Sequence, residues 1–176
     1  MQEGKITRQN QQKEAGSPIP TPEKKEWIDW MNAKVLQKAV VVDEEGNMLA
    51  LRRSEIGSAS RFGMWDLPGG SMSSEDLIGQ QENPHEAAIR REVEEETGLK
   101  VKDVAAIYVS SGIKKTKRAG DVLVLAIGYR CQVAGIRPQV TRSSEHIEDK
   151  WVTKEEFLGL EFGDDGGFHL RVIKQV

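Results

Sequence analysis

Hydrophobic residues first gather in a run that is typical of a buried strand. Residues 35–42 are mostly apolar and β-branched, a turn rich in Asp, Glu, Gly and Asn follows at 43–47, and residues 48–51 are apolar again. Because β-branched side chains fit a pleated sheet and Gly with Asn marks a reversal, this pattern predicts a strand, a turn and a second strand. Arg52 and Arg53 follow, where we expect the chain to return to the surface.

Further strand patterns lie later in the chain. Residues 64–67 form a short apolar stretch that runs into two glycines, and residues 101–110 carry spaced Val and Ile. The longest stretch, 121–133, is apolar at consecutive positions, which indicates burial on both faces. A strand of that kind belongs at the centre of a mixed sheet that helices cover, so the pattern predicts an α/β (α+β) fold.

The N-terminal part of the chain shows two different patterns. Residues 1–20 are rich in Gln, Lys, Glu and Gly with almost nothing to bury, so we expect a flexible tail before a single domain over residues 21–176. A Thr-Pro-Glu start at residues 21–23 opens a short helix. One face of this helix carries Trp27, Trp30 and Met31. Such an apolar stripe packs on its own domain or, as the alternative, forms a homodimer contact.

A strongly acidic helix is predicted over residues 84–97. Asn83 stands before Pro84 as an N-cap, Glu86 completes a capping box, and Gly98 stops the helix. The glutamates that share one face of its C-terminal half are Glu92, Glu95 and Glu96. The helix dipole disfavours each carboxylate there by about 0.3–1 kcal/mol. A bound divalent cation such as Mg²⁺ would remove this conflict, because hard ions take carboxylate oxygens.

The same helix carries a family resemblance. Residues 91–99 read Arg-Glu-Val-Glu-Glu-Glu-Thr-Gly-Leu. Together with Gly69 and Gly70 they resemble the Nudix box, whose pattern is Gly-x5-Glu-x7-Arg-Glu-U-x-Glu-Glu-x-Gly-U with U aliphatic. The second half matches at every specified position, and residues 65–70 are similar to the strand and loop that precede the box. The resemblance spans most of the chain after residue 35 and implies a Nudix-type α/β/α sandwich with a central mixed β-sheet.

The box departs from the family pattern at one point. Arg91 lies 21 positions after Gly70, whereas the pattern has 14, so about seven residues are inserted in the loop 71–83. Counted back from Arg91, the first glutamate of the pattern falls on Asn83. The candidates to take the place of this glutamate are Glu82, which is adjacent, and either Glu75 or Asp76 if the insertion lies after them. In the family this glutamate supports the arginine, so the departure concerns the loop more than the chemistry.

The resemblance also implies a metal site. The oxygen ligands of one or more Mg²⁺ or Mn²⁺ ions would come from Gly70, Glu92, Glu95 and Glu96. The glycine would contribute its carbonyl, and the glutamates would contribute their carboxylates. Arg91 would orient these glutamates and reach Glu95 one helical turn further on.

Other candidate site residues lie outside the box. The stretch 144–152 resembles the one before the last Nudix helix, where a glutamate-bearing loop leads into a Trp-bearing strand. In several Nudix hydrolases a glutamate from such a loop serves as general base or metal ligand, and here it would be Glu145 or Glu148, with a slight preference for Glu145. His146 is a base by residue type, but we expect an exposed structural histidine, and His169 is expected to be unrelated to catalysis. The candidates for contact with substrate phosphate are Arg52 and Arg53.

A basic run separates two of the predicted strands. Residues 114–120 read Lys-Lys-Thr-Lys-Arg-Ala-Gly and are predicted as a mobile loop. Such a run is a solvated hairpin tip or, as the alternative, a lip that steers phosphate. Near the C-terminus, Thr153 is expected to cap a helix over 154–160.

Composition excludes several classes of partner. With 176 residues and a net charge of −3, the chain has no electrostatic footprint for nucleic acid. No apolar run approaches the roughly 18–20 residues that cross a bilayer, so no membrane partner is expected. The single cysteine, Cys131, lies in an apolar strand pattern, which fits a buried thiol and a reduced, cytoplasmic setting.

The reaction that the resemblance implies is Mg²⁺-dependent hydrolysis of a pyrophosphate bond in a nucleoside diphosphate linked to another moiety. The expected partner is therefore a nucleotide or nucleotide derivative. The alternative is a catalytically inactive Nudix-fold module that binds nucleotides or has a regulatory role. The lengthened loop and Asn83 motivate this alternative, whereas the intact Glu-x-x-Glu-Glu run disfavours it.

Overall fold

The computed structural model describes residues 32–56, 59–78, 82–116, 120–163 and 167–176. The predicted N-terminal tail and the tryptophan stripe lie outside these residues, so both, with the homodimer alternative, stay predictions. The elements follow the order β1 Asn32–Val42, β2 Met48–Arg53, the 3-10 helix η1 Ala59–Arg61, β3 Trp65–Asp66, α2 Ser74–Ile78, α3 Pro84–Thr97, β4 Lys102–Thr116, β5 Gly120–Gln132, β6 His146–Val152, α4 Lys154–Leu158 and α5 Phe168–Ile173.

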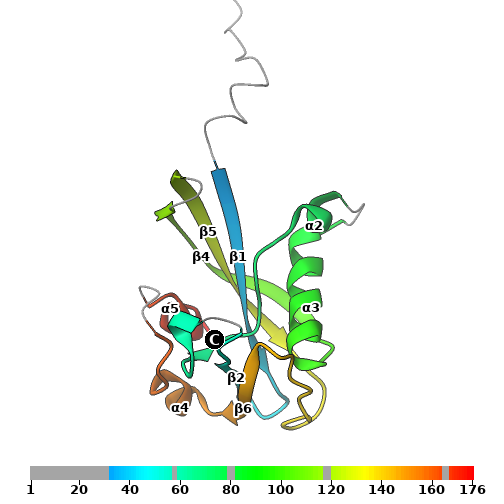
Figure 1. The fold of residues 1–176 in the computed structure, drawn as a ribbon. Helices are drawn as coiled ribbons and strands as arrows, with labels where there is room; N and C mark the ends of the chain where they lie inside the picture. Colours follow the sequence, from blue (N-terminus) through cyan, green and yellow to red (C-terminus); the bar gives the residue numbers. More distant parts are fainter. Residues whose placement is uncertain (1–31, 57–58, 79–81, 117–119, 164–166) are drawn as a thin grey trace, which may run out of the picture. The chain divides into compact units, whose positions relative to one another are not determined.

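The strands of the described residues form one six-stranded mixed sheet (Figure 1). Its order is β3-β2-β1-β5-β4, and β6 pairs with β2 beside that path. β1 is parallel to β5 and antiparallel to β2, while β4 and β5 form a long antiparallel hairpin. Both strands predicted from long apolar runs, β1 and β5, therefore lie in the interior of the sheet.

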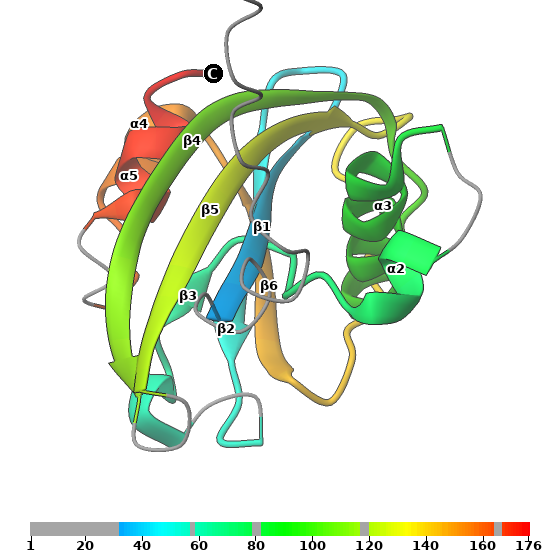
Figure 2. The ribbon, with the colours of Figure 1, turned by 90° about the horizontal axis from the view of Figure 1, so that it is seen from above.

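Helices cover both faces of the sheet, with α2 and α3 on one side and α4 and α5 on the other (Figure 2). Alternate side chains of β1 point to opposite faces: Ala39 and Val41 pack in the cluster that contains residues of α3, and Val40 and Val42 pack in the cluster that contains residues of α4 and α5. This explains the consecutive apolar positions, and the predicted α/β/α layering is confirmed. No helix in the described ranges is long and apolar enough to serve as a membrane span.

The acidic helix is found where it was predicted. Pro84 begins α3, and Gly98 ends it with a φ of 70° and an N–H that donates to the Glu94 carbonyl at 2.8 Å. The predicted capping box is wrong, because the Asn83 side chain makes no capping hydrogen bond and only its carbonyl accepts the first helical N–H groups. At α4 the cap was predicted correctly, since Thr153 forms a full capping box with Glu156.

Two segments predicted as loops are more regular in the structure. The loop 71–83 contains α2, whose start is stabilised by reciprocal hydrogen bonds between Ser73 and Asp76. This Ser-x-x-Asp arrangement is that of a capping box. β4 continues through Thr116, so Lys114 and Lys115 are strand residues, and residues 117–119 of the basic run lie outside the described ranges.

Candidate functional site

The segment 68–72 runs beside β1 and joins two groups of polar side chains. Backbone hydrogen bonds attach it to the strand, with the carbonyls of Pro68 and Gly70 accepting from the N–H groups of Ala39 and Gln37 at 2.8 Å each. Gly69 then contacts one polar side chain on each side of the segment. Its N–H donates to Glu96 Oε2 of α3 at 2.8 Å, and its carbonyl accepts from Lys38 Nζ of β1 at 2.7 Å.

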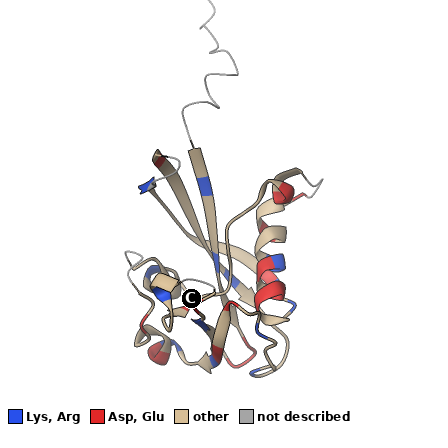
Figure 3. Cartoon of the chain, viewed as in Figure 1, with Lys and Arg blue, Asp and Glu red and all other residues tan. Residues whose placement is uncertain are grey.

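Two glutamates of α3 approach this segment, and acidic positions form bands along the helix (Figure 3). Glu96 is only 7% exposed, and burial raises its pKa to about 7 although Lys38 and the Gly69 N–H oppose the shift. Burial also raises the pKa of Glu92, against the opposing charge of Arg91. A Cβ atom at Gly70 would lie closer than 3.0 Å to the Glu92 carboxylate. Glycine at this position therefore lets the carboxylate rest against the backbone.

Arg91 is held by three carboxylates. Its Nη1 donates to Glu95 Oε2 at 2.8 Å, as predicted from their spacing, and its Nη2 lies 3.0 Å from Glu92 Oε1. Its fork also reaches Asp76, with Nε at 3.2 Å from Oδ1 and Nη2 at 3.1 Å from Oδ2. The Asp76 hydrogen bond and the neighbouring carboxylates raise the pKa of Arg91.

Asp76 thus takes the place that the box pattern gives to its first glutamate. It lies six positions after Gly70, the spacing of the pattern, so the inserted residues follow it. Among the candidates left open by the sequence, the structure brings Asp76 to Arg91, whereas no contact joins Glu75 or Glu82 to Arg91 among the described residues. The spacing from Gly70 was a signal that could have selected Asp76 from the candidates that the sequence left open.

The donor set fits a divalent cation in part. Glu92 and Glu96 are carboxylates whose charged forms are disfavoured by burial, and a cation beside them would relieve that penalty. The Gly70 carbonyl accepts one hydrogen bond and keeps a second lone pair. Glu95 is directed toward Arg91, and within the described ranges no three acidic, imidazole or thiol groups already surround one point. Glu95 would therefore have to leave Arg91 in order to coordinate.

A second group of charges surrounds the buried carboxylate of Asp66. Lys38 Nζ lies 2.9 Å from Oδ2 and His169 Nε2 lies 2.6 Å from Oδ1, while Arg53 also binds Oδ2 and Arg61 Nη2 stands 3.7 Å away. Burial alone would raise the pKa of Asp66, but Lys38, His169 and Arg53 hold it well below its usual range. Asp66 thereby fixes the Lys38 and Arg53 cations and the His169 imidazole beside the start of the segment 68–72.

Sequence reasoning missed this charged group. Lys38 is 3% exposed and donates to Asp66 and to the carbonyls of Leu67 and Gly69, so its three N–H groups are satisfied. A lysine inside an otherwise apolar strand was a signal that could have marked it. His169, expected to be unrelated to catalysis, contacts Asp66 although the two residues are 103 positions apart, and no local pattern marks such a contact.

The pairing of β2 with β6 places the remaining candidates. Arg52 is in register with Glu148, which explains their ion pair of 3.0 Å, and Arg53 is turned to Asp66 instead. Glu145 is exposed, and its carbonyl accepts from the Ser54 N–H at 2.8 Å. Among the described residues, the Glu145 carboxylate forms no ion pair.

His146 differs from its prediction. It is 5% exposed rather than solvated, because it opens β6 beside Arg53, where a bulge interrupts the register. Burial lowers its pKa to about 4, so the imidazole is neutral at neutral pH. Neither ring nitrogen has a hydrogen-bond partner in the described part of the chain.

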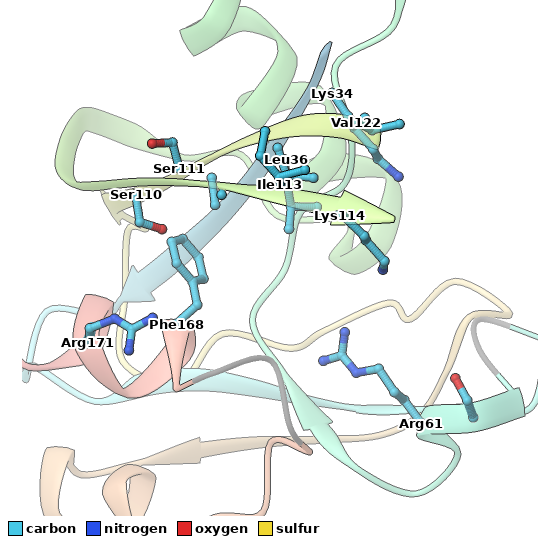
Figure 4. A pocket seen from close by; sticks show the side chains of 14 residues that line it. Lys34, Leu36, Arg61, Ser110, Ser111, Ile113, Lys114, Val122, Phe168 and Arg171 are labelled. Carbon is cyan, nitrogen blue, oxygen red and sulfur yellow. The ribbon is translucent and has the colours of Figure 1, made fainter. Parts of the chain in front are cut away.

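A cleft with a volume of about 640 Å³ opens on the face of β1 that carries Lys38 (Figure 4). This volume lies within the roughly 300–1,000 Å³ of small-molecule sites. Its floor is apolar, with Leu36, Val122, Val124 and Ala126. Its cations are Lys34, Arg61, Lys114 and Arg171. None of the described residues that line it is acidic, and Arg61 connects it to the Asp66 group.

Comparison with known proteins defines the class. The family model described as NUDIX domain matches residues 34–175. The chain therefore belongs to the Nudix family, and the predicted family and fold are confirmed.

Three individual relatives show how similar the chain is to known proteins. A MutT-like protein from Streptomyces ambofaciens is 33% identical over 117 residues, which cover 66% of this chain and 62% of that protein, so the match spans less than two thirds of the relative. The crystal structure of a MutT protein from Methanosarcina mazei Go1 is 28% identical with a TM-score of 0.57, over 82% of this chain and 93% of that one. The NUDIX domain of Shewanella oneidensis NrtR, complexed with ADP ribose, shares the fold at 15% identity, with a TM-score of 0.59 over 88% and 91% of the chains.

Proposed function

We propose that this protein hydrolyses a pyrophosphate bond in a nucleoside diphosphate linked to a further moiety, with Mg²⁺ or Mn²⁺ as cofactor. One observation carries the proposal: the buried Glu96 carboxylate accepts from the Gly69 N–H, and the Lys38 ammonium donates to the Gly69 carbonyl. Lys38 also binds Asp66, which stands 3.7 Å from Arg61 in the lining of the cation-lined cleft. A carboxylate that suits a cation is thus connected through a few contacts to a cleft whose cations suit phosphate. Family membership supports the same reaction class.

The proposed metal ligands are Glu92, Glu96 and the Gly70 carbonyl, with Glu95 as a ligand once it leaves Arg91. A divalent cation bound there would offset charge on phosphate oxygens and lower the pKa of a coordinated water. Arg91 positions Glu92 through their ion pair, binds Glu95 until that side chain coordinates, and is itself positioned by Asp76. Arg53 and Arg52 would supply positive charge toward the diphosphate, with Arg53 already fixed by Asp66.

Removal of the Asp76 carboxylate is expected to weaken catalysis without unfolding the protein. Asp76→Ala removes the carboxylate that holds the Arg91 guanidinium. The loss of a group that orients metal ligands lowers activity or metal affinity by about 10–100-fold. Steady-state rates across a Mg²⁺ titration measure this effect. Glu75→Ala is the matched control, because Glu75 is the exposed neighbour without a contact to Arg91. Equal rates for the two variants would contradict the positioning role.

For the general base we propose Glu145, because the Glu148 carboxylate is bound by Arg52. The loop of Glu145 adjoins the metal helix, since the Ser143 N–H donates to the Glu96 carbonyl at 3.1 Å. Glu145→Gln should lower kcat by at least about 100-fold and leave KM unchanged. Glu148→Gln is the comparison, and a kcat loss confined to this second variant would transfer the role to Glu148.

The substrate class is tested by a panel of nucleotides assayed with Mg²⁺, with Mn²⁺ and with EDTA. The panel contains ADP-ribose, nucleoside triphosphates, dinucleoside polyphosphates, NAD and nucleotide sugars. Metal-dependent release of a nucleoside monophosphate or pyrophosphate from any member supports the proposal. Tight binding of a member without turnover would support the alternative, a Nudix-fold nucleotide-binding or regulatory module that does not catalyse.

A further inference from the structure

The four cations of the cleft lie toward two different ends. Arg171 belongs to α5, beside Tyr108 of β4, and Arg61 stands near Asp66. Lys34 and Lys114 belong to the outer parts of β1 and β4, where they are in register with Val124 and Val122 of β5 (Figure 4). The inner end therefore adjoins the proposed diphosphate site, and the outer end does not.

The outer cations lie too far away to serve the same diphosphate. Lys34 precedes Lys38 by four residues on one face of β1. With a rise of roughly 3.3 Å per residue, the two positions are about 13 Å apart along the strand. This exceeds the length of a diphosphate and is close to that of a nucleoside. A diphosphate beside the Gly69 peptide therefore leaves the outer lysines for a different group.

The floor between the two ends suits an uncharged ring system. Leu36, Val124 and Ala126 present an apolar surface there, and Gly112 adds no side chain. Such a surface accommodates a base or sugar ring, whereas the ammonium groups at its outer edge suit an anion. In the described part of the chain, neither Lys34 nor Lys114 has a carboxylate partner that would neutralise it.

We propose that the substrate carries an additional phosphate monoester on the moiety remote from the scissile pyrophosphate, and that Lys34 and Lys114 bind this group. The inference rests on the proposed function, because it places the diphosphate at the inner end. In the reaction, water adds to one phosphorus of the pyrophosphate and the bridging P–O bond breaks. The remote monoester takes no part and stays on one product.

The test compares substrates that differ only in that phosphate: 2′-phospho-ADP-ribose with ADP-ribose, NADPH with NADH, and coenzyme A with dephospho-coenzyme A. For at least one pair we expect kcat/KM to be about ten-fold higher for the phosphorylated member, mainly through KM, as a charge-assisted contact is worth such a factor. Lys34→Gln and Lys114→Gln should each reduce this preference, and the double variant should abolish it. Each of these variants should lower kcat/KM for the phosphorylated member by a larger factor than for the unphosphorylated member.

Lys115→Gln is the matched control, because Lys115 is the next residue of β4, also exposed, and absent from the cleft lining. Its substrate preference should equal that of the wild type. Indistinguishable kcat/KM values within every pair would overturn the proposal. A preference that depends only on polyphosphate length, as between ATP and ADP, would also overturn it. Lysine variants that lower kcat/KM equally for both members of a pair would do the same.

Failure of the proposed hydrolysis is distinguishable from failure of this inference. If no pair is cleaved with Mg²⁺, calorimetric titration of the same pairs measures binding alone. If the phosphorylated member binds more tightly and the double lysine variant loses this difference, the phosphate site is supported although the proposed hydrolysis is wrong. Equal binding of both members would overturn the phosphate site itself.

Discussion

Replacement of Glu96 by glutamine is expected to abolish hydrolysis while the fold is kept. The amide still accepts the Gly69 N–H, but it cannot supply the negative charge that holds a cation. We expect kcat/KM to fall by at least about 100-fold, more than the loss of a ligand-orienting group causes. Burial raises the pKa of Glu96 from 4.5 to about 7, so the free energy of unfolding falls as the pH rises from about 4.5 to about 7 and stays lowered above it. The variant should therefore be no less stable than the wild type at pH 8.

Thermal unfolding with and without Mg²⁺ separates this effect from misfolding. The cation should raise the Tm of the wild type by mass action and leave that of Glu96→Gln unchanged. Glu94→Gln is the control on the same helix, because its exposed side chain has only a distant contact of 3.8 Å with Lys100. It should keep both activity and the response to Mg²⁺. Normal turnover by Glu96→Gln would show that the metal assignment is wrong.

Replacement of Asp66 by asparagine is expected to give the largest loss of stability. Lys38 would keep its buried ammonium without a counter-charge, and such broken pairs cost about 3–5 kcal/mol of unfolding free energy. Because the folded pKa of Asp66 is depressed, this stabilisation is present above its ordinary value of 3.8 and is lost as the pH falls through the folded value. Urea denaturation at pH 7 and in acid measures both effects.

The double variant Lys38→Met/Asp66→Asn tests the cause. If the unpaired ammonium produces the loss, removing it should restore part of the unfolding free energy. Asp121→Asn is the surface control and should change stability by less than about 0.5 kcal/mol. A loss for Asp66→Asn no larger than that of the control would contradict a structural role for the buried group.

The sequence predicted those parts of the fold that local patterns determine. The consecutive apolar residues of β1 and β5 could be satisfied only by burial on both faces, and the structure buries β1 in this way. Pro84 and Gly98 marked the ends of α3 because each has a conformational preference that suits its position. The Glu-x-x-Glu-Glu spacing likewise placed Glu92 and Glu96 together, because helical periodicity is a local property.

Long-range pairing could not be predicted in the same way. The ion pair of Arg52 with Glu148 depends on the register between β2 and β6, and the contact of Asp66 with His169 depends on where α5 packs. Neither pairing has a local signature. Glu95 was assigned to the metal by pattern, whereas the structure directs it to Arg91, a competition between partners that spacing does not resolve.

The two sides of the site rest on helices of different length. α3 has 14 residues, but α5, which supplies Arg171 and Phe168 to the cleft, has only six and cannot persist without its packing partners. That packing depends on close fit, since a Cβ atom at Gly128 would collide with Val172. Warming should therefore loosen the wall of the cleft before it disturbs the glutamates. If the proposed function holds, substrate affinity would then depend on temperature more steeply than metal binding by the glutamates does.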